Sequence, residues 1–253
     1  MKALLMDVGN SRLKWGISEN GEIRRTGQIS HQKIREQGLH ELVSKLPHAV
    51  DQVFASNVAG ASFATRLSGI IGMHCGREVH FAKTVHEACG VTNSYKQPRR
   101  MGVDRWVAMI GAWVEVKRAC AVVDVGTAAT IDVIDAGGAH LGGQILPGVA
   151  LMASALSSET SNIPRVRRRR TISAAGMDMF GRNTTSAVEC GALNAVVGAI
   201  DRVMVTLRAN GHDPVLILTG GDASSILSLL AEAPLHRPHL VLYGLLHLLE
   251  SRQ

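Results

Sequence analysis

The chain contains two short segments in which an acidic residue and a glycine recur with the same spacing. They are Leu4-Leu5-Met6-Asp7-Val8-Gly9-Asn10-Ser11 and Ala121-Val122-Val123-Asp124-Val125-Gly126-Thr127-Ala128. In each, the apolar run predicts a buried strand, and the glycine lets the next turn tighten until its N–H groups could face an anion. Two such turns would form a phosphate clamp, and Asp7 or Asp124 could hold a metal ion beside it. The repeat indicates nucleotide chemistry without a P-loop.

An Asp-x-Gly turn after a strand is also an ordinary hairpin turn, so neither segment alone decides the function. Similar return strands follow both turns, at Lys14-Trp15-Gly16-Ile17 and Thr130-Ile131-Asp132-Val133-Ile134. Lys14 could reach a β- or γ-phosphate as a point charge, and Thr127 could donate to a phosphate from the second turn. The pair of turns is therefore stronger evidence than either member.

A third segment, Gly102-Val103-Asp104-Arg105, joins a glycine to opposite charges at a predicted helix start. The helix dipole favours an ionised carboxylate there, and such a carboxylate can accept a hydroxyl proton. The guanidinium of Arg105 can hold a substrate carboxylate with two hydrogen bonds. The simpler interpretation is an acidic residue that interacts with its own helix, next to a surface arginine. The turn Thr219–Asp222 gives a weaker signal of close backbone approach to a nucleoside. The histidines have no ligand spacing, so we expect them to be packing or surface residues.

Alternating strands and helices must position these residues, which predicts an α/β fold. The duplicated motif favours two halves without a linker, which we place at residues 1–118 and 119–253. The predicted strands include 52–57, 78–82, 121–134 as a hairpin, and 215–218. The predicted helices are 31–46, 61–71, 104–118, one from Val149, 184–210 and 242–249.

The composition predicts a globular protein, with 46% hydrophobic and 19% charged residues among 253. No apolar run is long enough to span a bilayer and no secretory signal is evident, so we expect a soluble, cytoplasmic protein without a membrane partner. The four cysteines are scattered, which argues for reduced thiols. The net charge of +6 and the run Arg165–Arg170 suggest nucleic acid. However, the run lacks interleaved aromatics, which favours a solvated loop or a subunit contact.

Together the motifs resemble those of the type III pantothenate kinases, within the acetate and sugar kinase, Hsp70 and actin superfamily. The resemblance spans nearly the whole chain. Residues 7–14 resemble the family's first phosphate motif, 102–105 its substrate and catalytic motif, and 124–128 its second phosphate motif. Segments 142–148 and 181–184 also look like family segments. One departure is Ser11, where the family usually has Thr, and this change keeps the hydroxyl.

The resemblance implies two ribonuclease-H-like domains, a homodimer with the pantothenate pocket near the subunit interface, and ATP-dependent phosphorylation of pantothenate. Asp104 would be the general base, Asp7 would organise Mg²⁺, and Asp124 would bind a monovalent cation, K⁺ or NH₄⁺. The implied ATP-binding residues are Asp7, Val8, Gly9, Asn10, Ser11, Arg12, Leu13, Lys14 and Thr127. The implied pantothenate-binding residues are Tyr95, Gly102, Val103, Asp104, Arg105 and Thr184.

Two other functions remain open on the sequence. One is a non-catalytic accessory factor in transcription on the same fold, although the intact Asp104 and Lys14 argue against it. The other is a sugar or acetate kinase of the same superfamily, which differs in its substrate.

Overall fold

The computed structural model of the protein describes residues 1–160, 163–164 and 179–252. The chain divides into two compact units. The first contains Met1–Glu115 and the segment from His239 onward, and the second is Val116–Pro238. The Arg165–Arg170 run lies outside the described residues.

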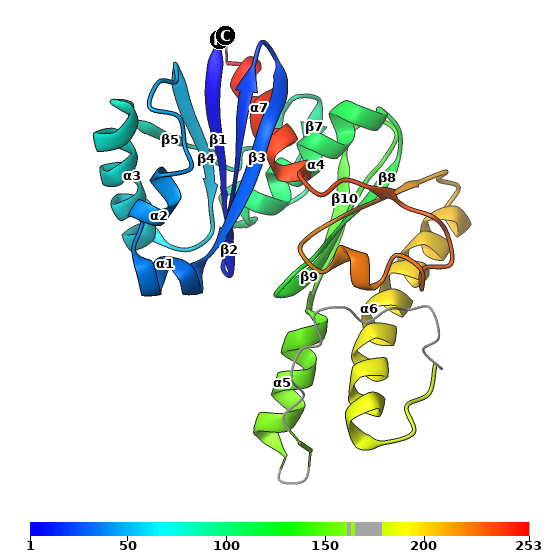
Figure 1. Ribbon diagram of the computed structural model, residues 1–253. Helices are drawn as coiled ribbons and strands as arrows, with labels where there is room; N and C mark the ends of the chain where they lie inside the picture. Colours follow the sequence, from blue (N-terminus) through cyan, green and yellow to red (C-terminus); the bar gives the residue numbers. More distant parts are fainter. Residues whose placement is uncertain (161–162, 165–178, 253) are drawn as a thin grey trace. The chain divides into compact units, whose positions relative to one another are not determined.

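The first unit is built on a five-stranded sheet in the order β3-β2-β1-β4-β5. Its strands are β1 (Lys2–Val8), β2 (Arg12–Glu19), β3 (Glu22–Ser30), β4 (Gln52–Asn57) and β5 (Val79–Phe81). The first three pair antiparallel, whereas β1, β4 and β5 run parallel (Figure 1). The helices are α1 (His31–Gln37), α2 (His40–Val43), α3 (Ala61–Cys75), α4 (Val103–Val116) and α7 (Leu240–Glu250). Shorter elements are β6 (Glu87–Ala88), β7 (Val91–Thr92) and the 3₁₀ turn Pro98–Arg100.

Both faces of the first sheet are covered. Successive side chains of a strand point to opposite faces, and Leu4, Met6 and Val8 of β1 join the core cluster that contains residues of α1, α2 and α3. Helix α7 packs against β1, β2 and β4. By this alternation, Asp7 belongs to the face that α7 covers, which is the face opposite Met6 and Val8.

The second unit repeats this arrangement with the order β10-β9-β8-β11-β12. Its strands are β8 (Cys120–Val125), β9 (Ala128–Ile134), β10 (His140–Pro147), β11 (Val215–Thr219) and β12 (Leu235–His236). Its helices are α5 (Val149–Glu159), α6 (Thr184–Ala209) and the 3₁₀ turn Ala223–Ser225. Again three antiparallel strands are extended by parallel ones. The duplicated sequence motif therefore marks a duplicated sheet, as expected for two ribonuclease-H-like domains.

The expected second domain, 119–253, needs correction at its end, because α7 belongs to the first unit. Its leucines are buried on the first sheet, and Gly244 of α7 meets Gly111 of α4 in close backbone contact. A Cβ on Gly244 would overlap the Val107 carbonyl of α4. The first sheet needs an apolar cover on this face, and the last helix of the chain supplies it.

The expected helix over 31–46 is in fact two short helices. Gly38 ends α1 with a φ of 81°, a left-handed value that glycine adopts without strain, and the chain restarts as α2 two residues later. The expected helix 61–71 continues to Cys75, where Gly76 ends it with a φ of 64°. The other predicted helices begin and end within two residues of the observed ones.

Among the described residues, α6 is long and apolar enough to cross a membrane by length and composition. Its apolar side, which includes Leu193, Val196 and Ile200, lies in the core cluster of the second sheet. Part of this apolar helix thus packs in the protein core, and 44% of its most apolar stretch is buried.

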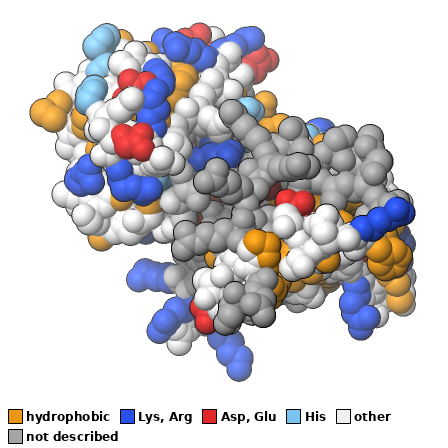
Figure 2. All heavy atoms as spheres, turned by 60° about the horizontal axis from the view of Figure 1, so that its bottom comes forward, with side chains coloured by type: hydrophobic (Ala, Val, Ile, Leu, Met, Phe, Trp, Pro, Cys, Tyr) orange, Lys and Arg blue, Asp and Glu red, His pale blue; other side chains and the backbone are white. Residues whose placement is uncertain are grey.

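Basic side chains lie at several places on the face of the molecule that Figure 2 draws. Some of these Lys and Arg side chains lie beside Asp or Glu, and others lie near one another.

Candidate active site

Asp7 lies at the end of β1, between two polar neighbours fixed by strand register. Lys14 is opposite Asp7 on the antiparallel β2, and Ser56 is opposite it on the parallel β4. The Ser56 hydroxyl donates to Asp7 Oδ1 at 2.9 Å, and Ser56 is fully buried. The first predicted motif thus acquires a partner, Ser56, that no short-range pattern reveals, because it comes from a strand about fifty residues later.

Asp7 is buried, with 9% of the residue's surface exposed. Burial raises the pKa of Asp7 above its ordinary value, while the Lys14 charge and the Ser56 hydrogen bond oppose the rise. The Asp104 charge adds to the raised pKa, so the carboxylates of Asp7 and Asp104 share one electrostatic environment. Two acidic groups that repel each other beside one lysine form a site that a divalent cation would stabilise. Asp7 therefore fits the expected role of organising Mg²⁺.

The turn after Asp7 closes on itself. The Gly9 N–H donates to the Arg12 carbonyl at 3.1 Å, so this N–H is used within the turn. The Val8 and Leu13 side chains lie in the core, so these residues can offer only backbone to a ligand. Asn10 is exposed at the tip of the turn. The backbone N–H groups that could bind a phosphate therefore belong to residues after Gly9. The sequence alone did not distinguish these N–H groups from that of Gly9.

Asp104 lies in the first turn of α4, as expected, and its position depends on Gly102. Asp104 Oδ1 accepts a hydrogen bond from the Arg105 N–H at 2.8 Å. A Cβ added to Gly102 would come within 2.7 Å of Asp104 Oδ1. The glycine of this motif therefore provides room for the carboxylate.

Arg105 and Tyr95, both predicted to contact substrate, lie together in the first unit. Arg105 is buried, and its Nη1 donates to the Tyr95 hydroxyl at 3.1 Å. The Tyr95 N–H in turn donates to Asn93 Oδ1 at 2.9 Å, and Asn93 is buried. The simpler interpretation of Arg105 as a surface neighbour of Asp104 is therefore wrong. A buried guanidinium held by a phenol is preorganised for a carboxylate ligand.

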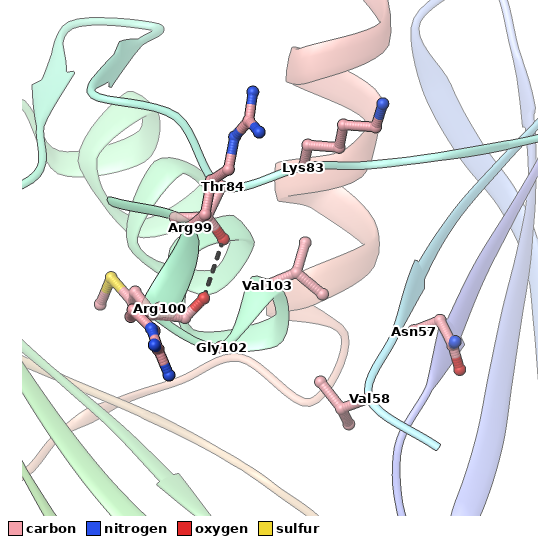
Figure 3. A pocket seen from close by; sticks show the side chains of 9 residues that line it. Asn57, Val58, Lys83, Thr84, Arg99, Arg100, Gly102 and Val103 are labelled. Carbon is pink, nitrogen blue, oxygen red and sulfur yellow. Dashed lines mark hydrogen bonds between the residues drawn. The ribbon is translucent and has the colours of Figure 1, made fainter. Parts of the chain in front are cut away.

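A pocket of about 580 Å³ opens beside this motif. Figure 3 shows the Lys83 and Arg99 side chains extending to the same side, while Arg100 extends away from them. The Thr84 hydroxyl donates to the Met101 carbonyl at 3.1 Å and ties the two segments of the wall together (Figure 3). The remaining lining comes from Asn57, Val58, Gly102 and Val103. The pocket thus lies between the end of β4 and residues 102–103 and has a basic rim.

In the second unit, Asp124 lies near the end of β8 and Thr127 lies in the turn that follows, and glycines surround this turn. The Gly148 N–H donates to the Thr127 carbonyl at 2.9 Å, and a Cβ on Gly148 would overlap the carbonyl of Gly126. Gly220, with a φ of 108°, lies against the backbone of Val125 in the same way. The turn after β11 therefore packs directly on residues 124–125 of the chain itself. The expected approach of Thr219–Asp222 to a nucleoside stays a prediction.

Thr184 is the first residue of α6, and its place is fixed by a capping box. Asn183 Oδ1 accepts from the Ser186 N–H at 2.9 Å, and the Ser186 hydroxyl accepts from the Asn183 N–H at 3.2 Å. A Cβ on Gly181 would overlap the Ala187 N–H group. The segment 181–184 thus ends in an exposed threonine at a helix start. The structure groups Asp7, Lys14, Tyr95, Asp104 and Arg105 in the first unit, and Asp124, Thr127 and Thr184 in the second.

These residues lie in a chain whose sequence matches a known family. The model of the type III pantothenate kinase family matches residues 3–206. The chain belongs to the type III pantothenate kinase family. The type III pantothenate kinase of Azoarcus sp. strain BH72 is 37% identical over 246 residues, which cover 96% of this chain and 88% of that protein. The type III pantothenate kinase of Nitrosococcus oceani is 34% identical over 252 residues, with 96% and 91% covered.

Solved structures agree with the fold of this type III pantothenate kinase family member. A protein from Campylobacter jejuni described as a Baf family transcriptional activator superposes with a TM-score of 0.59 at 21% identity, covering 98% of both chains. A 2-dehydro-3-deoxygalactonokinase protein from Sinorhizobium meliloti superposes with a TM-score of 0.60 at 14% identity, covering 96% of both. The fold is that of the acetate and sugar kinase, Hsp70 and actin superfamily. The protein is accordingly an enzyme, a kinase that uses ATP with a divalent metal ion.

Proposed function

We propose that the protein transfers the γ-phosphoryl group of ATP to the primary hydroxyl of pantothenate, the first step of coenzyme A biosynthesis. Family membership supports the reaction. The observation that carries the assignment of residues is the shared environment of Asp7, Lys14 and Asp104 in the first unit. A phosphate-binding lysine, a metal-organising carboxylate and a candidate base are thus close enough to influence one another.

In this proposal the residues act mainly by positioning and by neutralising charge, because the transition state of phosphoryl transfer is loose. Asp104 accepts the hydroxyl proton late in the transfer and orients the hydroxyl before it. Lys14 and Thr127 contact the ATP phosphates, with residues 8–13 around them. Mg²⁺ held near Asp7 would neutralise phosphate charge when bound.

The acceptor is held by its carboxylate. Arg105 is buried and already fixed by the Tyr95 hydroxyl, so a carboxylate can bind it with little loss of side-chain entropy. Gly102, Val103 and Thr184 complete the acceptor-binding set that we propose. Asp124, at the end of β8, is the proposed ligand of K⁺ or NH₄⁺.

We also propose that the active form is a homodimer located in the cytoplasm. The α5–α6 face of the second unit exposes Leu151 and Leu156 and contains an apolar pocket of about 390 Å³ to which Thr184 contributes. A second copy covering this face would bury those leucines beside Thr184. All four cysteines are free thiols, which suits a reducing compartment. Light scattering of the purified protein tests the dimer.

The first experiment measures ADP release with ATP, Mg²⁺ and pantothenate, in K⁺ or in Na⁺. We expect pantothenate-dependent turnover that K⁺ stimulates. Asp104→Asn should lower kcat by roughly two to four orders of magnitude, because the base is lost, and leave ATP binding nearly intact. Turnover of the variant within a few-fold of the wild type would contradict the role of Asp104. Absence of pantothenate-dependent turnover under every cation would contradict the reaction and favour another acceptor or a regulator.

A further inference from the structure

A buried serine on β4 is bonded to one oxygen of the Asp7 carboxylate. Ser56 lies opposite Asp7 in the parallel pairing of β1 with β4. The serine is fully buried, and its hydroxyl donates to Asp7 Oδ1 at 2.9 Å. The roles proposed above for residues 7–14 and 102–105 give this serine no task of its own.

The alternation of side chains along β4 places Ser56 on the same face of the sheet as Asp7. Val53 and Ala55 lie in the core cluster that contains residues of α1, α2 and α3, so Phe54 and Ser56 belong to the opposite face. Phe54 is fully buried there. Ser56 is thus a polar side chain near the end of an otherwise apolar strand.

Stability of the fold alone does not require a hydroxyl at this position. A buried hydroxyl loses its hydrogen bonds to water, and two buried polar partners contribute little net stability compared with apolar side chains of the same shape. The hydroxyl of Ser56 therefore points to a requirement of its partner. That partner is Asp7, the carboxylate that fits the role of organising Mg²⁺.

The bond from Ser56 orients the carboxylate without adding a positive charge. Rotation of an aspartate carboxylate about its last side-chain bond is soft, and a donor fixed on one oxygen restricts it. On the other side of β1, the cationic Lys14 lies opposite Asp7. A second cation in place of Ser56 would neutralise the carboxylate further and weaken its attraction for Mg²⁺, whereas a neutral hydroxyl does not. Carboxylates that bind metal ions are commonly held by such hydrogen bonds.

We propose that Ser56 is a positioning residue for the divalent cation, because its neutral hydroxyl orients the Asp7 carboxylate and leaves the charge of that carboxylate available to Mg²⁺. This inference rests on the proposed role of Asp7. Ser56 itself touches neither the nucleotide nor the acceptor. Its effect should fall on the dependence of ATP binding on Mg²⁺.

Four variants of the full-length protein separate this role from packing. Ser56→Ala removes the hydroxyl, and Ser56→Cys fills nearly the same space with a weaker donor. Ser18→Ala is the matched control, since it removes a buried serine hydroxyl from β2 of the same sheet, opposite Ala3. The double variant of Ser56→Ala with Asp7→Asn shows whether the serine acts through Asp7. Melting temperatures of all four identify any variant that is not folded at the assay temperature.

Calorimetric titration with ATP, in Mg²⁺ and in EDTA, gives the factor by which the metal ion strengthens ATP binding, without requiring phosphoryl transfer. We expect this factor to fall about tenfold in Ser56→Ala, as usual when the hydrogen-bond partner of a metal-binding carboxylate is lost. ATP affinity in EDTA should stay unchanged, because Asp7 keeps its charge. Ser56→Cys should lie between Ser56→Ala and the wild type, and Ser18→Ala should keep the wild-type factor.

Two further measurements distinguish positioning of Asp7 from a structural role. In the Asp7→Asn background, Ser56→Ala should change the factor no further, since the two residues act as one unit. In turnover assays, the Mg²⁺ concentration that gives half of the maximal rate should rise about tenfold in Ser56→Ala, with the KM for pantothenate unchanged.

An unchanged factor in folded Ser56→Ala would overturn the inference, and so would an equal fall in Ser18→Ala or the full tenfold fall in the Asp7→Asn background. If Ser56→Ala does not fold, a wild-type factor in Ser56→Cys would overturn it. A wild-type protein whose ATP affinity is the same in Mg²⁺ and in EDTA would refute the role of Asp7 and this inference together. A wild-type protein that needs Mg²⁺ to bind ATP but does not phosphorylate pantothenate would refute the proposed acceptor alone.

Discussion

At the scale of single residues, Asp7 shows how a site residue can work against the stability of the fold. Its carboxyl group is buried next to one lysine and within the field of Asp104, and burial raises its pKa. An ionised carboxylate in such a place is destabilising until a cation compensates for it. The presence of an aspartate at position 7 is therefore better explained by a role in function than by a contribution to stability.

We therefore expect Asp7→Asn to stabilise the metal-free protein and to impair the kinase. A carboxyl group with a raised pKa contributes stability that is full below its unfolded pKa, near 3.8, and is lost as the pH rises through the folded value. The advantage of Asn should thus be absent in acid and grow toward neutral pH. It should reach about 2–4 °C in melting temperature, the shift that about 1 kcal/mol produces in a protein of this size.

Melting curves from pH 3 to pH 8 without Mg²⁺ test this sign, and turnover should fall by about 10²-fold or more. A variant that melts lower than the wild type at neutral pH would show that Asp7 stabilises the fold.

Gly102 offers a sharper test of the geometry around Asp104. Its φ is not left-handed, so alanine is tolerated by the backbone, but the new Cβ would lie 2.7 Å from Asp104 Oδ1. The carboxylate must then move, and we expect Gly102→Ala to lower kcat by about 10- to 10²-fold. ATP affinity should stay unchanged.

The control for Gly102→Ala is Gly69→Ala in α3, where a Cβ meets nothing within 4 Å. Steady-state kinetics of both variants provide the measurement. Equal kcat values would mean that the position of Asp104 is not critical.

At the scale of elements, the proposed role of Thr184 links the stability of the start of α6 to substrate binding. The capping box of Asn183 and Ser186 satisfies the exposed N–H groups of this helix end and fixes Thr184. We expect Asn183→Ala to cost about 1 kcal/mol of unfolding free energy, the usual value for a lost N-cap. The KM for pantothenate should rise, because Thr184 loses its fixed place.

Asn183→Ser is the matched control for Asn183→Ala, since serine also caps helices. Denaturant unfolding and pantothenate kinetics measure the two effects. If Asn183→Ser raised the KM as much as Asn183→Ala does, the position of Thr184 would not depend on the cap.

The same scale shows what the sequence predicts and what it cannot. Both hairpins, the strand at 52–57 and the helices that begin near residues 103, 149 and 184 follow from apolar periodicity and glycine turns. Ser56 beside Asp7 and His31 beside Ser11 do not, because each depends on the pairing of strands. Similarly, the need for glycine at positions 148 and 220 follows only from the fold, because both glycines lie against the backbone of residues 125–127. Local sequence patterns therefore predict the individual elements. The contacts that elements make with one another around the candidate site depend on the pairing and packing of those elements.

At the scale of the molecule, the two units are copies of one sheet plan, but they are not independent segments of the chain. The first unit is completed only by α7, which follows the whole second unit in sequence. Eight of its eleven residues are hydrophobic, and most are buried. The Asp7 face of the first sheet is therefore covered by a helix that follows the whole second unit in sequence.

A variant at the contact between α4 and α7 tests whether the first unit depends on α7. A Cβ on Gly244 would overlap the Val107 carbonyl, and the neighbouring atoms belong to a helix backbone that cannot yield cheaply. We expect Gly244→Ala to destabilise the protein by about 1–3 kcal/mol, as overpacking usually does, and to lower ATP affinity because α4 and α7 flank the Asp7 face.

Gly198→Ala is the matched control for Gly244→Ala. Gly198 lies within α6 and its Cβ would meet nothing within 4 Å, so alanine should stabilise the protein by about 0.4–1 kcal/mol. Calorimetric melting of both variants supplies the comparison. If Gly244→Ala instead gained stability like Gly198→Ala, the helices would have room to separate. The close packing of α7 on α4 would then not be needed for the stability of the first unit. The Asp7 face would not depend on that packing either.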